Sequence, residues 1–518
     1  MFRATLAVAV ADLRRRTRSP TLLVAGLLTA YLGKLIVVDG ELVVAGSYTG
    51  TGTAAWYGGA VCGLGTAVLV VVGFPLVRGG VTHDRDTGVA TLLATSPLGD
   101  AAYLLGKFLS AFAALAVVTA VLGGATTAAF LLGGTGPLDL LVLWEPFALL
   151  TLPAMAVVAA AAVLTETVGP LRGTAGTAAY VVGTLAVVVA GAQGSLPFDL
   201  SGLGLIQRSV IADVVAQHPT VTRPVEGFAY RPPGGETTAF EWSGLAWTPA
   251  QLLDRAATFA VAGGLLAAAW AAFDRFDPDG GLSLPTLGGD ASEGTTAEPP
   301  AADDAARPAV DDAVAALPTV ETGRFGLLAA TLAEVRMALR RRRAWYGAVA
   351  AVVVGSLVGP AGPVRSLLVP VGTLLALPAL SGLGSRERRA DTARLLFTTA
   401  SPVGLLVPTF LSGVAVVAVV VGPAAIRFLT LGETGAVIGL AGAAVALPAA
   451  AVAVGVWTAR PRAFETVLLL AWYLGPVNGV APLDFLGARP ATVAAGVPYA
   501  YLAAAPVLLA VAAVGRRR

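Results

Sequence analysis

Long apolar runs separated by short polar segments recur along the whole chain. A bilayer-spanning helix needs about 20 mostly apolar residues, and in hydrocarbon the backbone must satisfy its own hydrogen bonds, so these runs are predicted to be helices. Twelve runs are candidate membrane spans. They lie near residues 20–38, 57–77, 106–132, 146–164, 174–193, 256–273, 345–360, 364–384, 404–424, 435–457, 464–480 and 491–514. The pattern predicts an all-α polytopic membrane protein with about twelve transmembrane helices.

The composition agrees with a membrane protein. Of the 518 residues, 56% are hydrophobic and only 13% are charged, which is about half the charged share of an ordinary soluble domain. The chain has one cysteine, Cys62, and two histidines, His83 and His218. This inventory excludes a disulfide framework and makes a Cys/His metal site unexpected. We expect no catalytic residue set, no metal and no other cofactor.

Positively charged residues set the expected orientation. If the chain starts inside the cell and the spans alternate, all but eight of the 34 Lys and Arg residues fall on the cytoplasmic side. The eight exceptions are Lys34, Arg208, Arg223, Arg231, Arg255, Arg365, Arg427 and Arg489. This bias predicts a plasma-membrane protein with both termini cytoplasmic. Basic runs such as Arg340–Arg343 then mark topology beside the lipid bilayer, and no nucleic-acid partner is expected.

The stretch 274–323 differs in character from the rest of the chain. It is rich in Asp, Glu, Pro, Gly and Ala and carries a strong net negative charge. It has too little apolar surface to drive folding, which predicts a disordered cytoplasmic linker. The linker divides the candidate spans six and six, so we expect a first half over residues 1–273 and a second half over residues 324–518.

Short motifs recur in the same order in both halves. The first motif is Ala4–Ala7, which recurs as Ala330–Ala333. The second is Asp86-Thr87 followed by Ser96-Pro97, which recurs as Asp391-Thr392 followed by Ser401-Pro402. The third is Leu152–Ala154, which recurs as Leu447–Ala449. The matches stand at equivalent places in the expected topology, and both halves begin on the same side. This favours two parallel six-helix repeats, related by a pseudo-two-fold axis along the membrane normal.

An amphipathic helix is expected before the first span of each half. Its apolar stripe is formed by Phe2, Leu6, Val10 and Leu13 in the first half and by Leu328, Leu332, Val335 and Leu339 in the second. Arginines follow each stripe. Such a helix is predicted to lie along the membrane interface, with its apolar side in lipid. A plain basic flank of the first span is the alternative.

The polar segment between the second and third spans, residues 84–107, is a candidate contact for a soluble partner. A short capped helix is expected over residues 89–93, ending before Ser96-Pro97. Its candidate N-cap residues are Asp84, Asp86 and Thr87, and the side chains that it would present are Leu92 and Leu93. An ordinary polar loop is the alternative.

The same segment resembles the signature of the type-2 ABC exporter permeases. That signature has an acidic-Arg-acidic element followed by glycine, then a leucine pair, a small residue before proline, and Gly-Lys at the third span. The matching residues are Asp84, Arg85, Asp86, Thr87, Gly88, Leu92, Leu93, Ser96, Pro97, Gly106 and Lys107. In the second half they are Arg386, Glu387, Arg388, Asp391, Thr392, Leu395, Leu396, Ser401 and Pro402. The second copy has Ala393 in place of the glycine and lacks Gly-Lys.

The resemblance implies a permease subunit that is not itself an enzyme. A pair of separate ABC ATP-binding subunits would drive it from the cytoplasmic side, and residues 84–97 and 386–402 would be the ATPase-coupling segments. The sequence agrees that ATP is bound elsewhere. Its nearest approach to a phosphate-binding loop has Phe108 where Ser or Thr must hold magnesium.

Two other classes of function stay open. An ion-coupled secondary transporter usually buries carboxylates in mid-membrane, whereas Glu166 and Glu465 lie close to span ends. This favours energy that arrives from outside the spans. A non-transporting membrane scaffold would need only the apolar spans and the external cap. Gly59 and Gly63 are spaced to permit a close helix–helix contact, and glycine-rich helix faces could support further association.

Residues 194–251 form the one sizeable external segment of the expected topology. Its aromatic residues are Phe198, Phe228, Tyr230, Phe240, Trp242 and Trp247. So many aromatic side chains predict a small folded cap rather than a free tether. A lid over an exit path is the functional interpretation, and structural cover for the helix ends is the simpler one.

Overall fold

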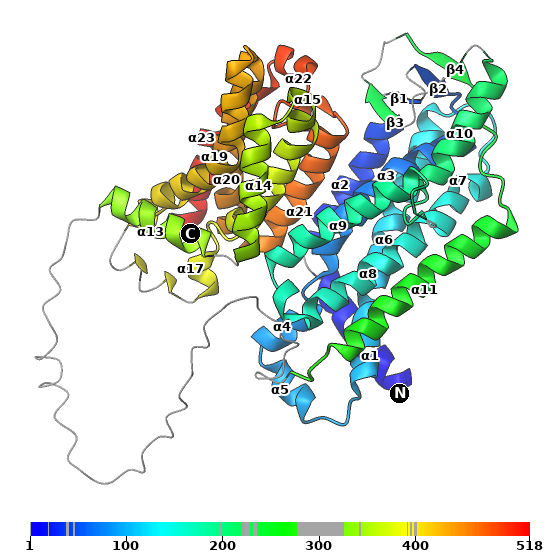
Figure 1. Cartoon of the computed structure of the whole chain (residues 1–518). Helices are drawn as coiled ribbons and strands as arrows, with labels where there is room; N and C mark the ends of the chain where they lie inside the picture. The colour runs from blue at the N-terminus through cyan, green and yellow to red at the C-terminus, as the bar shows by residue number, and fades with distance from the viewer. Residues whose placement is uncertain are drawn as a thin grey trace, which may run out of the picture.

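The computed structural model describes most of the chain, but not the predicted linker. The described residues are 2–18, 20–37, 41–44, 47–196, 199–219, 221, 228–231, 236–276, 326–340, 343–390, 392–393, 396–397 and 401–517. Nearly all of the stretch 274–323 therefore lies outside them. Within them, two helical bundles stand side by side, one from each half of the chain (Figure 1).

The first bundle holds the helices that precede residue 272. They are α1 (Phe2–Thr17), α2 (Pro20–Val37), α3 (Ala54–Val77), α4 (Gly80–Asp86), α5 (Val89–Ala94), α6 (Asp100–Gly133), α7 (Leu140–Pro146), the π-helical turn η1 (Phe147–Thr151), α8 (Leu152–Thr167), the 3₁₀ turn η2 (Gly169–Leu171), α9 (Thr174–Ala192), α10 (Leu203–Gln217) and α11 (Pro249–Ala271).

The second bundle begins at residue 327. Its helices are α13 (Leu327–Leu339), α14 (Arg343–Val358), α15 (Ala361–Pro363), the π-helical turn η3 (Val364–Leu368), α16 (Val369–Leu380), α17 (Arg386–Arg389), α19 (Leu406–Thr430), α20 (Thr434–Thr458), α21 (Pro461–Trp472), the π-helical turn η4 (Tyr473–Val477), the 3₁₀ turn η5 (Ala481–Leu483), α22 (Pro490–Ala494) and α23 (Val497–Arg517).

Each of the twelve apolar runs corresponds to helical structure. Among the described residues, eight helical stretches are long and apolar enough to cross a membrane. They are Ala54–Asp86, Asp100–Gly133, Leu140–Thr167, Pro249–Ala271, Ala361–Leu380, Leu406–Thr430, Thr434–Thr458 and Val497–Arg517. Apolar helices over Gly176–Gly191 and Trp345–Val358 are shorter. The prediction of a membrane-embedded helical protein is confirmed, and length with hydropathy supports eight of the twelve expected spans.

Helix α3 is the centre of the first bundle. Nearly all of its residues from Ala54 to Val77 are buried, because α2, α6, α8 and α9 pack around it. Its glycines allow close approach by neighbours: Leu122 of α6 lies directly against Gly65, and Leu115 lies against Gly73. Small residues at such contacts are how apolar helices gain van der Waals packing when lipid is the surrounding solvent.

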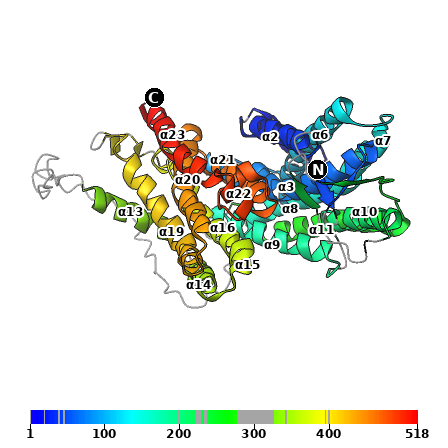
Figure 2. The same cartoon turned by 90° about the horizontal axis from the view of Figure 1, so that it is seen from above.

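The outer helices pack in the same way in both bundles. Helices α1 and α2 pack on α6, and α11 packs on α8; in the second bundle α13 and α14 pack on α19, and α23 packs on α20. The two bundles meet along two lines, where α3 contacts α21 and where α9 contacts α16 (Figure 2).

The apolar stripes of the first helix of each half are partly exposed, and their predicted place in lipid stays a prediction. Phe2, Leu6 and Val10 of α1 are exposed, while Leu13 packs against the core. Leu328 and Leu332 of α13 are likewise exposed. Both helices, together with α4, α5 and α17, lie toward the same end of the molecule (Figure 1).

A four-stranded sheet caps the opposite end of the first bundle (Figure 1). Its strands are β1 (Glu41–Val44), β2 (Tyr48–Gly50), β3 (Phe228–Arg231) and β4 (Thr238–Phe240), in the order β3-β1-β2-β4. Strand β1 is antiparallel to β2 and β3, and β2 is parallel to β4. The expected folded cap is present, and it also contains β1 and β2, which lie outside the predicted external segment.

The cap is fixed to α3 by aromatic packing. The ring of Trp242 is buried directly against Gly59, and Trp56 packs edge-on against Trp242 and Phe240. The interpretation of Gly59 as a helix–helix contact is therefore replaced: its missing side chain makes room for an indole ring of the cap.

Replacing Gly59 by Ala is expected to loosen the cap, because the new Cβ would overlap the Trp242 ring. Overpacking of this kind costs about 1–3 kcal/mol of unfolding free energy. Tryptophan fluorescence during thermal unfolding in detergent measures the loss. Gly263→Ala on α11 is the matched control, since a Cβ there meets no other atom; equal destabilisation by both variants would contradict the packing.

Candidate functional site

The candidate docking segment begins at a sharp corner between α3 and α4. Gly79 has a φ of +100°, which glycine adopts without steric penalty. The Glu166 carboxylate at the end of α8 accepts hydrogen bonds from the Val81 amide at 2.7 Å and the Thr82 amide at 2.9 Å, and also from the Gly79 amide. A buried carboxylate thus satisfies the free amides at the start of α4.

A second buried carboxylate, Asp12, joins α1 to α6. It accepts hydrogen bonds from Nε of Arg16 at 2.7 Å and Oγ of Ser110 at 2.8 Å, and lies 3.2 Å from Nζ of Lys107 and 2.5 Å from Nη2 of Arg15. Burial by itself raises the pKa of Asp12, but the charges of Arg16, Lys107 and Arg15 outweigh it and hold the pKa well below its ordinary value. The carboxylate is therefore ionised at neutral pH.

Lys107 connects this cluster to α4. Its Nζ lies 2.8 Å from Oδ2 of Asp84 and donates to the Gly80 carbonyl at 3.1 Å, and the Tyr103 hydroxyl donates to the same Asp84 oxygen at 2.7 Å. Two residues singled out in the signature, Asp84 and Lys107, are thus partners in one buried ion pair. Asp84 anchors the segment from inside, whereas Asp86 is exposed at the end of α4.

The predicted N-cap was wrong. Asp84 and Asp86 lie within α4, Thr87 follows its end, and Gly88 with a φ of +73° stands at the N-cap position of α5. The sequence analysis expected one short helix, but the Glu166 carboxylate starts a helix before it. The predicted end of the helix is confirmed: α5 stops at Ala94, and Ser96 Oγ donates to the Leu93 carbonyl at 2.8 Å.

The two leucines of the signature lie in different environments. Leu92 is 71% exposed, and Val89 on the same helix is also exposed. Leu93 packs inward against the cluster that contains Val81 and Phe273. Helix α5 therefore presents a small apolar face beside the exposed Asp86 while its other face is fixed to the bundle.

Residues that follow α11 contact α4 and the turn that follows α5. Arg275 donates to the carbonyls of Ser96 at 2.9 Å and Leu98 at 3.2 Å, and lies 3.3 Å from the Asp100 carboxylate. The Arg85 guanidinium lies over the Phe276 ring, 5.6 Å from its centre. Arg85 is therefore engaged within the protein.

In the second half, α17 is tied to α13 and α23 by ion pairs. Arg386 lies 2.9 Å from Glu334 of α13, and Glu387 lies 2.8 Å from Arg516 of α23. Burial raises the pKa of Glu334, and Arg386 offsets only part of that effect. The first helix of each half, α1 or α13, is thus bound to the following polar segment, through Asp12 and Lys107 in one half and Glu334 in the other.

Part of the second signature can be placed. The Thr392 amide donates to the Glu387 carbonyl at 3.0 Å, and Leu396 is exposed. Asp391 and Leu395 lie outside the described residues.

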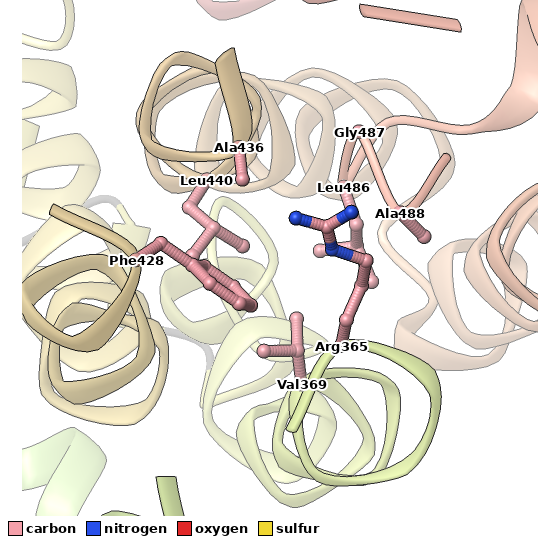
Figure 3. Close-up of a pocket in the computed structure, with 8 residues that line it drawn as sticks. All are labelled: Arg365, Val369, Phe428, Ala436, Leu440, Leu486, Gly487 and Ala488. Atoms are coloured by element: carbon pink, nitrogen blue, oxygen red, sulfur yellow. The ribbon is translucent and has the colours of Figure 1, made fainter. Parts of the chain in front are cut away.

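A small cavity lies at the opposite end of the second bundle (Figure 3). The Arg365 guanidinium extends across it, lies over the Phe428 ring at 5.1 Å, and pairs with Glu433. Leu440 and Leu486 form apolar walls. Because Glu433 pairs with the only charged residue on the wall, we assign the cavity no ligand.

Neither Asp12 nor the capping role of Glu166 was predicted from the sequence. Asp12 did carry a signal, because Arg15 and Arg16 follow it at helical i,i+3 and i,i+4 spacing. Glu166 carried none, since its partners are backbone amides. Among the described residues, no group of three or more His, Cys, Asp or Glu side chains could hold a metal ion. The chain matches no family model and no curated protein.

Replacing Asp12 by Asn would leave Arg16 and Lys107 buried without their shared carboxylate. The unfolding free energy at neutral pH is expected to fall by about 3–5 kcal/mol. Since the folded pKa of Asp12 is depressed, its contribution is present above the unfolded pKa of about 4 and is lost as the pH falls below it. Thermal unfolding in detergent should show a constant gap from wild type above about pH 5 and a closing gap below.

Asp86→Asn is the control for this experiment, because Asp86 is exposed and is expected to change stability by less than about 0.5 kcal/mol. A gap for Asp12→Asn that stays the same down to about pH 3 would contradict the role of the ionised carboxylate.

Proposed function

We propose that this chain is the transmembrane permease subunit of an ATP-driven ABC exporter, in which two six-span halves are fused. The observation that carries the proposal is the construction of the α4–α5 segment. It is anchored to α1, α6 and α8 by buried carboxylates, and it presents Leu92 and Asp86 outward. A pair of separate ATP-binding subunits would grip this segment and the one around α17.

A rigidly held tip is what a mechanical coupling element requires. Force applied at α5 reaches α3 through the α4 corner and reaches α1 through Lys107, because ion pairs and capped amides resist sliding more than apolar packing does. The exposed Leu92 and Val89 suit a groove on a soluble partner, where short helices bind through a few apolar anchors. The resemblance to the exporter signature supplies the identity of that partner.

The packing of the helices supports two parallel repeats. In both bundles the interfacial helix packs on the third span, and the sixth span packs on the fourth. Between the bundles, the second span of each half contacts the fifth span of the other, as α3 with α21 and α16 with α9. Reciprocal contacts of this kind are expected for two halves related by an axis along the bundle. They support the count of twelve spans.

The distribution of charge supports an orientation. Arg14–Arg16 and Arg516–Arg517 lie at helix ends toward the end of the molecule that holds α4 and α5, and the sheet lies at the other. By the positive-inside rule the α4 end is cytoplasmic. Both termini and the ATPase-facing segments would then be inside the cell, and the sheet would lie outside the plasma membrane.

The buried carboxylates at the membrane edge support an external energy source. Glu166 is held by three amides and Glu465 by the Thr177 hydroxyl. An ion-coupled transporter needs a carboxylate that is free to load and release its ion. Fixed carboxylates fit structural roles, which leaves the driving step to a partner.

Replacing Leu92 by Glu is expected to weaken binding of the ATP-binding subunit by about tenfold or more, because a charge would enter an apolar contact. Folding should be unaffected, since the side chain is exposed. The measurement is co-purification with an ABC ATP-binding subunit that is co-expressed with this chain, followed by ATP hydrolysis by the complex in proteoliposomes.

Leu138→Glu is the matched control, because this exposed leucine follows α6 at the opposite end of the molecule. Unchanged binding by Leu92→Glu, or equal loss in both variants, would contradict the docking role. Transport by the purified chain under an ion gradient alone would instead indicate a secondary transporter.

A further inference from the structure

The corner between α3 and α4 packs against α21, a helix of the second half of the chain. Arg78, which follows the last residue of α3, donates hydrogen bonds to the Thr177 hydroxyl of α9 and the Gly173 carbonyl. The Thr177 hydroxyl donates in turn to Oε2 of Glu465 on α21, at 3.0 Å. A continuous line of polar contacts therefore crosses from one bundle to the other.

This crossing is buried and its charges are balanced. Thr177 and Glu465 are almost wholly inaccessible, and Arg78 is 7% exposed. A second cation from α21, Arg462, lies against Gly79, where a side chain would collide with the guanidinium. Two arginines thus accompany the carboxylates of Glu465 and Glu166. Ions removed from water persist only when paired, so the contacts are mutually dependent.

An apolar cavity lies beside the crossing, within the line of contact between the bundles. It is lined by residues of α2, α3, α6 and α21, among them Thr29, Val68, Val72, Leu76, Thr466 and Leu470. The Thr29 and Thr466 hydroxyls bond to carbonyls of their own helices, so the wall is apolar in effect. Leu76 and Thr466 are close neighbours in sequence of Arg78 and Glu465, which places the polar crossing at the α4 end of this cavity.

We propose that Arg78, Thr177 and Glu465 form a latch that holds the two bundles together at the α4 end. The latch opens when α4 moves, because Glu166 binds the amides of Gly79, Val81 and Thr82 and so ties α4 to the residue that follows Arg78. A buried ionic contact is either made with good geometry or replaced by water. This gives the seam two discrete states.

Among the described residues, the latch occurs at only one of the two contacts between the bundles. If the halves are parallel repeats, Gly384 corresponds to Gly79, and the atoms packed around Gly384 belong to Val452 and Val456 of its own half. The corner at Gly384 thus has no contact with the other half that matches the contact of Gly79 with Arg462 of α21. The contact between α3 and α21 is therefore the one that the latch controls.

Spin labels test the latch without any partner subunit. In a Cys62→Ser background, one pair of labels is placed on the exposed Ala11 and Ala390 at the α4 end, and another on Leu138 and Leu431 at the opposite end. The distance between the two labels of each pair is then measured by pulsed electron–electron double resonance in lipid nanodiscs. Thr177→Val removes the bridging hydroxyl and should give a longer, broader distance distribution at the α4 end, with no change at the opposite end.

Thr466→Val is the matched control, since it removes a buried hydroxyl that bonds only within α21 among the contacts described. Thr177→Ser restores the hydroxyl and should restore the wild-type distribution. Should Thr177→Val fail to fold, Glu465→Gln, which keeps the size of the side chain but loses its charge, should give the same one-sided change. An unchanged distribution, a change at both ends, or an equal effect of Thr466→Val would overturn the latch. None of these outcomes depends on the proposed ATP-driven function.

Discussion

Buried charge at one end of the first bundle is the constraint on which the rest of the arrangement depends. Apolar helices packed against apolar neighbours have little to define their register, because lipid and protein interior are almost equally favourable surroundings. Ion pairs and capped amides are directional, and they cannot be broken cheaply away from water. Asp12, Asp84 and Glu166 each bind groups from another helix. They therefore fix α1, α4, α6 and α8 relative to one another.

The buried ion pairs and capped amides hold the exposed face of α5 in a fixed position. Leu92 would be an ordinary surface leucine on a free loop, but on α5 it stands at the tip of a supported corner. The same corner continues through Arg78 and Gly79 onto α21 of the second half. One short stretch of chain thus connects an exposed apolar face, a buried charge cluster and the contact between the bundles, which is the physical basis of both proposals made above.

The two bundles share a pattern of helix contacts and differ at their edges. Helix α1 is bound to the polar segment by the ionised Asp12 in the first half. In the second half α13 is bound to α17 through Glu334, which stands at a different position of its helix and whose pKa is raised by burial. The sheet over the first half joins strands β1 and β2 to strands β3 and β4. Packing between helices constrains many side chains at once, while each ion pair or surface strand depends on a few residues and can change alone.

The sequence by itself determined the class of protein, because apolar runs of this length must be helices in a membrane. It also located the polar segment at 84–97 and the pairing partners Asp84 and Lys107, although not their contact. Only the tertiary structure decided that Asp84 faces inward and Asp86 outward, that Glu166 caps α4, and that Gly59 receives the Trp242 ring. Periodicity along one chain records which face of a helix is apolar. Contacts between distant helices depend on how those faces meet in space, and nothing in the local pattern encodes that meeting.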